Sequence, residues 1–267
     1  MRTFRIKWAL SQCSPSQWRR HGAVLVSRSR FYSALLLKLV PGLSKRPIEL
    51  RLKEGGRFLV YEFMTLYIYN EIFVGKCYDV EAMRGTIVDI GANTGLFALR
   101  MSQLWPAATI ICFEPYPPNF EKLNETVAIN KLTNVTTVMK GVGGTSRTEK
   151  LYIDPRNIGG HSISMTPSSE SVPIVISDLA SVLRDIARCD MLKLDCEGAE
   201  KEIIESITPA MASRIEQIVM EFTPKLYDVA SLQDRLRALG YAVSSRQGIF
   251  FARASARSEQ KDRIGAA

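Results

Sequence analysis

The sequence contains few residues of the kinds that build disulfide frameworks or zinc sites. Only 5 of its 267 residues are Cys, at positions 13, 77, 112, 189 and 196, and no two of them form a CxxC pair. An odd number of scattered cysteines excludes both kinds of site and is typical of reduced thiols in a cytosolic protein. We therefore expect a cytoplasmic location. Histidine is scarcer still, with 2 residues.

Long apolar runs are also missing. The run 34–37 already ends at Lys38, whereas a membrane-spanning helix needs ~20 apolar residues. Hydrophobic residues make up 46% of the chain and charged residues 23%. This composition is ordinary for a globular protein, and it excludes bulk disorder, collagen-like repeats and a coiled coil as descriptions of the whole chain.

Acidic residues are nearly absent from the first part of the chain. Residues 1–57 contain 13 Lys/Arg against 2 Asp/Glu, whereas residues 58–267 contain 22 against 25. The net charge of +8 therefore belongs to the N-terminal segment. Such a segment favours an anionic membrane surface, a nucleic acid or an acidic substrate, or it is simply solvated. One expectation is peripheral membrane contact through residues 1–45; another is that its amphipathic piece, 31–43, packs on the rest of the protein.

The rest of the chain alternates short apolar runs with helical patterns. Strands are predicted at 86–90, 109–113, 135–139, 191–194 and 215–222, with helices after Gly95 and at 119–130 and 231–239. Buried strands alternating with helices indicate a parallel sheet covered on both faces. A turn at 246–248 predicts a closing antiparallel hairpin. We expect a basic helical extension with a lead-in hairpin (1–80), an α/β domain (81–253) and a flexible tail (254–267).

The first motif follows the strand 86–90 and opens a helix. Its residues include Asp89, Gly91, Ala92, Asn93 and Gly95. Glycines let the backbone turn sharply and approach a ligand closely. A dinucleotide site would need the pattern GxGxxG, which Asn93 interrupts. The acid before the first glycine suits a ligand with a positive amino group better than a pyrophosphate. The alternative is a tight turn between strand and helix that binds no ligand.

The second motif begins at Glu114, directly after the strand 109–113. A carboxylate at this position can accept hydrogen bonds from both hydroxyls of a ribose. Pro115 shapes the turn into the next helix. The alternative is a surface acid without a ligand.

The third motif crowds acidic residues at the end of the fourth strand. Asp195 and Glu197 lie at the edge where open α/β sheets bind ligands. Mutual repulsion raises at least one carboxyl pKa in such a group, which suits a general base. A divalent metal bound by these oxygens and a purely structural role at a helix start are left open. His161, in the run GGHS, is a third candidate base.

Together these motifs closely resemble the FkbM family of S-adenosylmethionine-dependent methyltransferases. The runs VDIGANTG, FEPYPPNFEKLNETVAIN, LKLDCEGAE and IVMEF follow one another with the family's order and spacing over residues 55–225. The resemblance implies an α/β fold of the Rossmann-like class I methyltransferase type. It also implies a mostly parallel seven-stranded sheet in the order 3-2-1-4-5-7-6, with helices on both faces and a C-terminal antiparallel hairpin. Residues 81–253 are then the methyltransferase domain.

The resemblance also implies how the motifs hold the cofactor, S-adenosylmethionine. The methionine part lies among Asp89, Gly91, Ala92, Asn93 and Gly95. Glu114 and Pro115 lie at the ribose, and Gly141 and Val142 lie near the adenine. Asp195 and Glu197 match the acidic motif of the family at the active edge.

We therefore predict an O-methyltransferase that acts on a hydroxyl of a sugar, glycolipid or natural product. Because a hydroxyl is a weak acid, a base (Asp195, Glu197 or His161) must remove its proton during in-line transfer. The expected partner is a hydroxyl-bearing small molecule or glycan, and not a nucleic acid. The alternatives are an RNA methyltransferase, which the basic segment suggests although Cys196 does not follow a proline, and a non-catalytic cofactor-binding scaffold.

Overall fold

The computed structural model describes residues 2–40, 43–80, 83–153, 170–196, 198–222, 226–246 and 248–255. Two of the candidate bases, His161 and Glu197, lie outside these ranges, as does nearly all of the predicted tail 254–267. Their assignments stay predictions.

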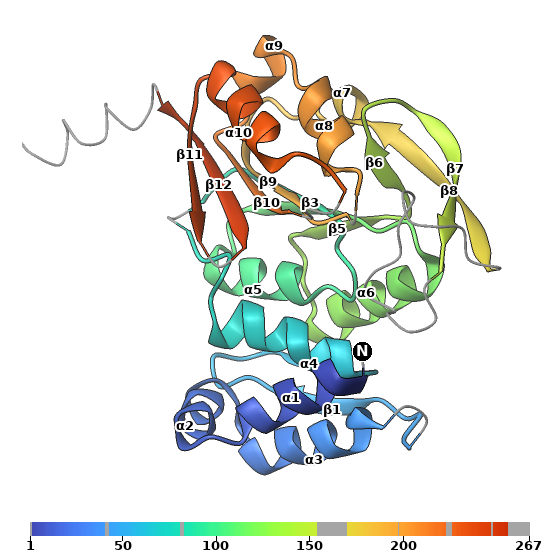
Figure 1. Ribbon diagram of the computed structural model, residues 1–267, viewed down its shortest axis with the longest axis vertical. Helices are drawn as coiled ribbons and strands as arrows, with labels where there is room; N and C mark the ends of the chain where they lie inside the picture. The colour runs from blue at the N-terminus through green and yellow to red at the C-terminus, as the bar shows by residue number, and fades with distance from the viewer. Residues whose placement is uncertain are drawn as a thin grey trace, which may run out of the picture.

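A central sheet of seven strands organises the molecule (Figure 1). Its strands are β3 (Thr86–Ile90), β4 (Thr109–Phe113), β5 (Val135–Val138), β9 (Cys189–Leu194), β10 (Gln217–Glu221), β11 (Tyr241–Arg246) and β12 (Ile249–Ala254). The spatial order is β11-β12-β10-β9-β3-β4-β5. The pairs from β10 to β5 are parallel, and β12 pairs antiparallel with β10 and β11. In chain order this is 3-2-1-4-5-7-6, so the predicted fold class and closing hairpin are confirmed.

Helices cover both faces of this sheet (Figure 1). One face carries α5 (Leu96–Leu104) and α6 (Pro117–Asn130), and the other carries α7 (Leu179–Val182), α8 (Glu200–Ser206), α9 (Pro209–Ala212) and α10 (Val229–Ala238). All six residues of β9 are buried. Burial on both faces explains why the central strands read as continuous apolar runs instead of alternating patterns.

A smaller sheet stands beside the main one. It consists of β6 (Gly141–Gly143), β7 (Arg147–Tyr152) and β8 (Ser171–Asp178), in the order β6-β8-β7. Strand β7 pairs antiparallel with β8 along its whole length. Leu151, Ile174 and Ile176 form a small apolar core on this sheet.

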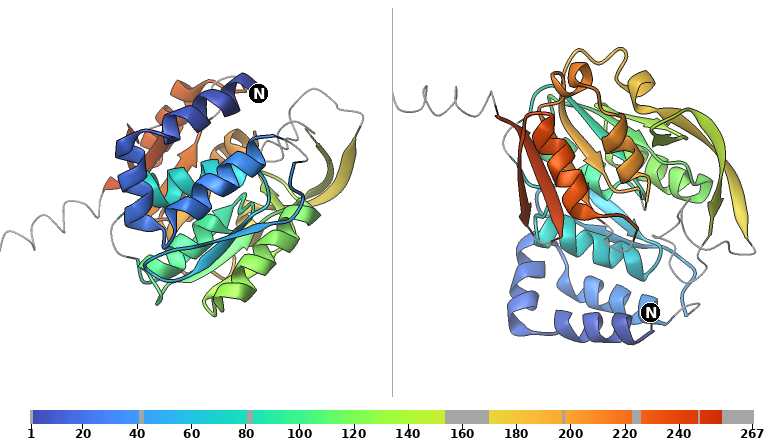
Figure 2. Two further views of the ribbon diagram at one scale, coloured as in Figure 1. Left: turned by 90° about the horizontal axis from the view of Figure 1, so that it is seen from below. Right: turned by 45° about the horizontal axis from the view of Figure 1, so that its top comes forward.

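The N-terminal segment forms one end of the molecule (Figures 1 and 2). It contains α1 (Arg2–Gln12), α2 (Pro15–Val24), α3 (Arg28–Leu39), the antiparallel strands β1 (Ile48–Arg51) and β2 (Arg57–Val60), α4 (Phe63–Tyr69) and the π-helical turn η1 (Asn70–Val74). Phe31 and Leu35 of α3 are buried, as expected if this helix packs on the protein. One cluster of buried side chains runs from Ala9 through these helices to Ile249.

The helices of the described ranges are all too short or too polar to cross a membrane.

Candidate functional site

The register of the central strands brings the three motifs to one edge of the sheet. Ile90, the last residue of β3, pairs with the last residues of both β4 and β9. The residues that follow these strands, Gly91, Glu114 and Asp195, therefore leave the sheet at the same level. Glu221, the last residue of β10, ends beside Asp195 because β10 pairs with β9 in parallel.

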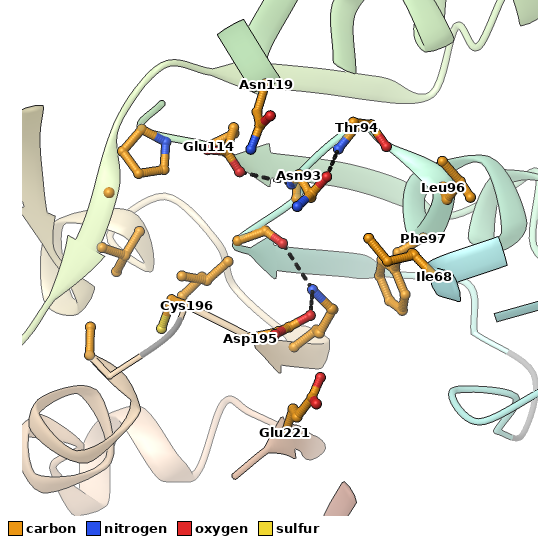
Figure 3. A pocket seen from close by; sticks show the side chains of 18 of the residues that line it. Ile68, Asn93, Thr94, Leu96, Phe97, Glu114, Asn119, Asp195, Cys196 and Glu221 are labelled. Carbon is orange, nitrogen blue, oxygen red and sulfur yellow. Dashed lines mark hydrogen bonds and ion pairs between the residues drawn. The ribbon is translucent and has the colours of Figure 1, made fainter. Parts of the chain in front are cut away.

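A cavity opens at this edge (Figure 3). Its wall is built by the loops after β3, β4 and β9, by the small sheet, and by α4 with η1. Eight of the residues predicted for the site line it: Gly91, Ala92, Asn93, Glu114, Pro115, Gly141, Val142 and Asp195. Glu114 and Asn119 lie toward one end, and Asp195 and Glu221 toward the other (Figure 3).

Gly91 lets two of these loops touch. Its φ of 82° is in the left-handed region, and an added Cβ would lie 1.8 Å from the carbonyl oxygen of Asp195. The backbone N–H of Asp195 donates to the carbonyl oxygen of Ile90 at 3.1 Å. No side chain larger than hydrogen fits between these loops, so the close approach itself requires glycine.

Glu114 organises the loop after β3. One carboxylate oxygen accepts from the backbone N–H of Asn93 at 2.8 Å, and the other from that of Tyr116 at 2.9 Å. Asn93 is held at a φ of 49°, a conformation that asparagine tolerates better than most residues. Burial raises the pKa of Glu114 to about 7, although both backbone N–H donors oppose the shift. Each carboxylate oxygen keeps a free lone pair that can accept from a ligand hydroxyl.

Two buried polar atoms at the cavity wall have no partner among the described residues. They are Oδ1 of Asn119 and Oγ1 of Thr94, and both residues line the cavity. Most buried polar atoms in proteins are hydrogen-bonded. A polar ligand in the cavity is therefore the natural partner for these two atoms, as a nucleoside-containing cofactor would be.

Asp89 does not line the cavity. Its side chain is fully buried beneath the loop, and Oδ1 lies 2.9 Å from Nζ of Lys193. The same Nζ lies 3.3 Å from Oδ2 of Asp195 and donates to the carbonyl oxygen of Gly91 at 3.1 Å. In this structure the carboxylate of Asp89 is paired with Lys193, and its place beside the methionine part of the cofactor stays a prediction.

Lys193 keeps its positive charge in this buried position. Burial alone lowers the pKa of a lysine, but the charges of Asp89 and Asp195 outweigh that effect and raise it. The ammonium also lies 5.3 Å from the ring centre of Phe97.

Gly95 likewise shapes the site from outside the cavity lining. It is the N-cap of α5 with a φ of 83°, and an added Cβ would lie 2.8 Å from Cδ1 of Leu123. Its role in the structure is to turn the chain from the loop into α5 against α6.

The acidic motif after β9 divides into a cavity part and a structural part. Asp195 lines the cavity, whereas the carboxylate of Glu200 accepts from the backbone N–H groups of Cys196 and Gly198, both at 2.8 Å. Among the described residues, which exclude Glu197, no three His, Cys, Asp or Glu side chains are grouped to hold a metal ion.

Two further acids line the cavity and were missed in the sequence. Glu71 comes from η1 and Glu221 from the end of β10. Glu221 could have been found, because it ends the fifth strand at the level where Asp195 follows the fourth. Glu71 has no such signal, because only the packing of η1 against the sheet edge brings it to the cavity.

Glu71 has an unusual proton affinity for a carboxyl group. Burial raises its pKa to about 7, a hydrogen bond from Tyr67 opposes the shift, and the charge of Asp195 adds to it. Glu71 lies outside the acidic motif in which the sequence predicts a raised pKa. Within that motif the pKa of Glu200 is raised, mainly by burial, and the charge of Asp195 adds to the shift.

Comparison with known families matches this architecture. The family model of the methyltransferase FkbM domain matches residues 89–243, more than half of the chain. The chain belongs to this family. The matched range begins within β3 and includes both Glu114 and Asp195, so the resemblance stated from the sequence is confirmed.

Several methyltransferases are similar to this FkbM-family chain. Methyltransferase 1 of Beauveria bassiana is 27% identical over 202 residues, which cover 67% of this chain and 81% of that protein. The 31-O-demethyl-FK506 methyltransferase FkbM of Streptomyces tacrolimicus is 25% identical over 221 residues, covering 70% and 85%. Among solved structures, M. jannaschii TYW2 in complex with AdoMet has a TM-score of 0.43 at 13% identity, covering 78% and 84%.

The buried charge of Lys193 generates a stability prediction. Lys193→Met leaves Asp89 as an unpaired buried acid, and we expect it to lower the free energy of unfolding by about 3–5 kcal/mol. Lys193→Met combined with Asp89→Asn should recover most of this loss, because no buried charge remains. Urea unfolding followed by circular dichroism measures both. Lys201→Met, at a side chain that is 51% exposed, is the matched control. If Lys193→Met lowers the free energy of unfolding by less than about 1 kcal/mol, Lys193 is not the counter-charge that the buried Asp89 needs.

Proposed function

We propose that this FkbM-family methyltransferase uses S-adenosylmethionine to methylate a hydroxyl oxygen of an uncharged sugar, glycolipid or natural product. One observation carries the proposal: a single cavity has a cradle for a nucleoside at one end and a group of carboxylates at the other. When bound, S-adenosylmethionine supplies an activated methyl group on a sulfonium sulfur.

The cofactor end of the cavity fits a nucleoside with a ribose. Glu114 has one lone pair free on each oxygen, in a buried position where a charge-assisted hydrogen bond is strong. The unpartnered oxygens of Asn119 and Thr94 lie in the same wall. Gly91 lets the loop after β3 pack directly against the loop after β9. Gly141 and Val142 continue the wall and are proposed to lie near the adenine.

The acceptor end favours an uncharged molecule. Among the described residues the cavity is lined by four carboxylates, Glu71, Glu114, Asp195 and Glu221, and one cation, Lys193. That cation is already paired with two carboxylates. An acceptor with its own negative charge would be repelled, whereas a hydroxyl donates readily to a carboxylate.

The name of one relative specifies methyl transfer to oxygen, and the name of a second specifies a sugar acid as the acceptor. One carries an oxygen position in its name, 31-O-demethyl-FK506 methyltransferase. Another, 27% identical over 128 residues, is the hexuronic acid methyltransferase AglP of Haloferax volcanii, and it covers 47% of this chain and 51% of that protein. Both names specify acceptors that carry hydroxyl groups.

We assign proton removal to Glu71 and orientation of the acceptor hydroxyl to Asp195. The backbone of Asp195 lies against Gly91, and Lys193 balances the charge of its carboxylate. Glu71 has the better proton affinity for a base, because a pKa of about 7 matches neutral conditions. The sequence favours Asp195 as the base, so the two assignments need a direct test.

The cofactor assignment predicts a pH-dependent affinity. Only the carboxylate form of Glu114 accepts both ribose hydroxyls well, and its pKa is about 7. Affinity for S-adenosylmethionine should therefore rise with pH up to about 7 and fall about tenfold per pH unit below it. Glu114→Gln should weaken binding at least about tenfold and remove this dependence. Calorimetric titration measures both, with Glu121→Gln on the exposed side of α6 as control. Binding of NADH instead would overturn the assignment.

The acceptor assignment predicts which molecules receive label. With S-adenosylmethionine labelled in its methyl group, we expect transfer to neutral glycosides or polyketides and at least about tenfold less to matched uronic acids. The product should be an alkali-stable methyl ether, whereas methylation of a carboxylate would give an alkali-labile ester. Cofactor binding without transfer to any acceptor would favour the non-catalytic scaffold, and transfer to RNA alone would favour the RNA methyltransferase.

Two variants, each measured at saturating cofactor, test which residue is the base. Glu71→Gln should lower kcat by about 10²–10⁴ and remove the rise of kcat with pH through about 7. Asp195→Asn should raise KM for the acceptor and keep that pH limb. Loss of the limb in Asp195→Asn, with Glu71→Gln fully active, would assign the base to Asp195 instead.

A further inference from the structure

Exposed apolar side chains gather on the N-terminal helices. Eleven large apolar side chains are exposed among the described residues, and nine of them lie between residues 4 and 43. The highest exposures in this segment are 68% for Leu10 and Leu36, 62% for Val26 and 57% for Leu43. Clusters of exposed apolar side chains on a protein surface mark sites that contact a partner or a membrane.

Helix α3 carries two apolar faces, and only one of them serves the fold. Phe31 and its neighbours on one face are buried against α1, α4 and β1. Leu36, Leu37, Val40 and Leu43 are exposed on the other side and beyond the end of the helix, at 68%, 37%, 55% and 57%. We call these four residues the α3 patch. Their exposure costs the isolated protein hydrophobic free energy that a partner would recover.

The charge around the α3 patch is of one sign. Residues 2–48 contain ten Lys/Arg and no Asp/Glu, and the first acid of the chain is Glu49. Lys45 and Arg46 follow the patch directly and are exposed. The buried ammonium of Lys38 donates to the carbonyl oxygens of Ser44 and Arg46, which ties this basic segment to the end of α3.

The same end of the molecule borders the cavity. The ring of Phe4 on α1 lies 5.7 Å from the ring of Tyr67, which lines the cavity, and Trp8 lies 5.2 Å from Phe63. In Figures 1 and 2 the three helices form one end of the molecule, with α4 between them and α5. Helix α1 therefore packs against a residue of the cavity wall.

We propose that the three N-terminal helices dock the protein on a bilayer surface that contains anionic phospholipids. The surface combines basic residues with exposed leucines, which matches anionic headgroups above an apolar layer. A second copy of the chain would bring a surface of the same charge and be repelled. A nucleic acid would neutralise the basic residues but leave the leucines of the α3 patch in water.

Vesicle sedimentation tests this docking without needing an acceptor or turnover. The full chain should sediment with vesicles of phosphatidylcholine and phosphatidylglycerol and remain in solution with phosphatidylcholine alone. Salt should weaken the binding, because exposed charges are screened. Since this readout does not involve methyl transfer, its failure leaves the proposed function untouched.

Two double variants separate the apolar and basic contributions. Leu36→Gln/Leu37→Gln and Lys45→Glu/Arg46→Glu should each weaken vesicle binding at least about tenfold. The matched apolar control is Met139→Gln/Val175→Gln, at side chains 52% and 50% exposed on another part of the molecule. The matched charge control is Lys150→Glu/Arg184→Glu, both also exposed. Both controls should bind like the wild type, and thermal unfolding verifies that all four variants fold.

Four outcomes would overturn the proposal. One is equal sedimentation with neutral and anionic vesicles, or with neither. Another is unchanged binding by Leu36→Gln/Leu37→Gln in a folded protein. The third is a dimer, seen by light scattering, that Leu36→Gln/Leu37→Gln converts to a monomer. That result would assign the α3 patch to contact with a second copy of the chain. Tight RNA binding without vesicle binding would assign the surface to nucleic acid.

Discussion

The buried positive charge of Lys193 is shared by Asp89 and Asp195. These carboxylates belong to two strands, β3 and the end of β9, that pair at the centre of the sheet. A shift in their register would leave Asp89 buried without a counter-charge, which is far more costly than losing a surface ion pair. The ion pairs of Lys193 therefore favour the register of β3 and β9 that places Gly91 against Asp195. The cavity exists because this register brings the ends of three motifs together.

A buried carboxyl group with a raised pKa lies at each end of the cavity. Glu114 at the cofactor end and Glu71 at the acceptor end both have a pKa of about 7, in each case mainly because burial disfavours the charged form. The opposing hydrogen bonds come from backbone N–H groups at Glu114 and from Tyr67 at Glu71. Carboxyl groups in this state respond strongly to whatever enters beside them. A ligand that donates hydrogen bonds favours the charged form of both.

The N-terminal segment has a structural side and an exposed side. Buried residues from Ala9 to Phe73 join the core below the sheet, and η1 carries Glu71 into the cavity wall. The opposite side keeps leucines and basic residues in solvent. The segment thus belongs to the fold of the methyltransferase and, through α4 and η1, to the wall of the cavity. The proposed docking uses only the side that the fold leaves exposed.

The sequence alone determined the fold class, the order of the strands and most of the residues that line the cavity near Glu114. Buried strands alternate with helices, and local motifs follow strand ends, so Gly91, Asn93 and Glu114 could be found from position alone. Only the structure shows that Asp89 pairs with Lys193, 104 residues away along the chain. It also added Glu71, whose place depends on how η1 packs. Local patterns reveal what neighbours in the chain do, whereas pairing across the core and burial are decided only when distant segments meet.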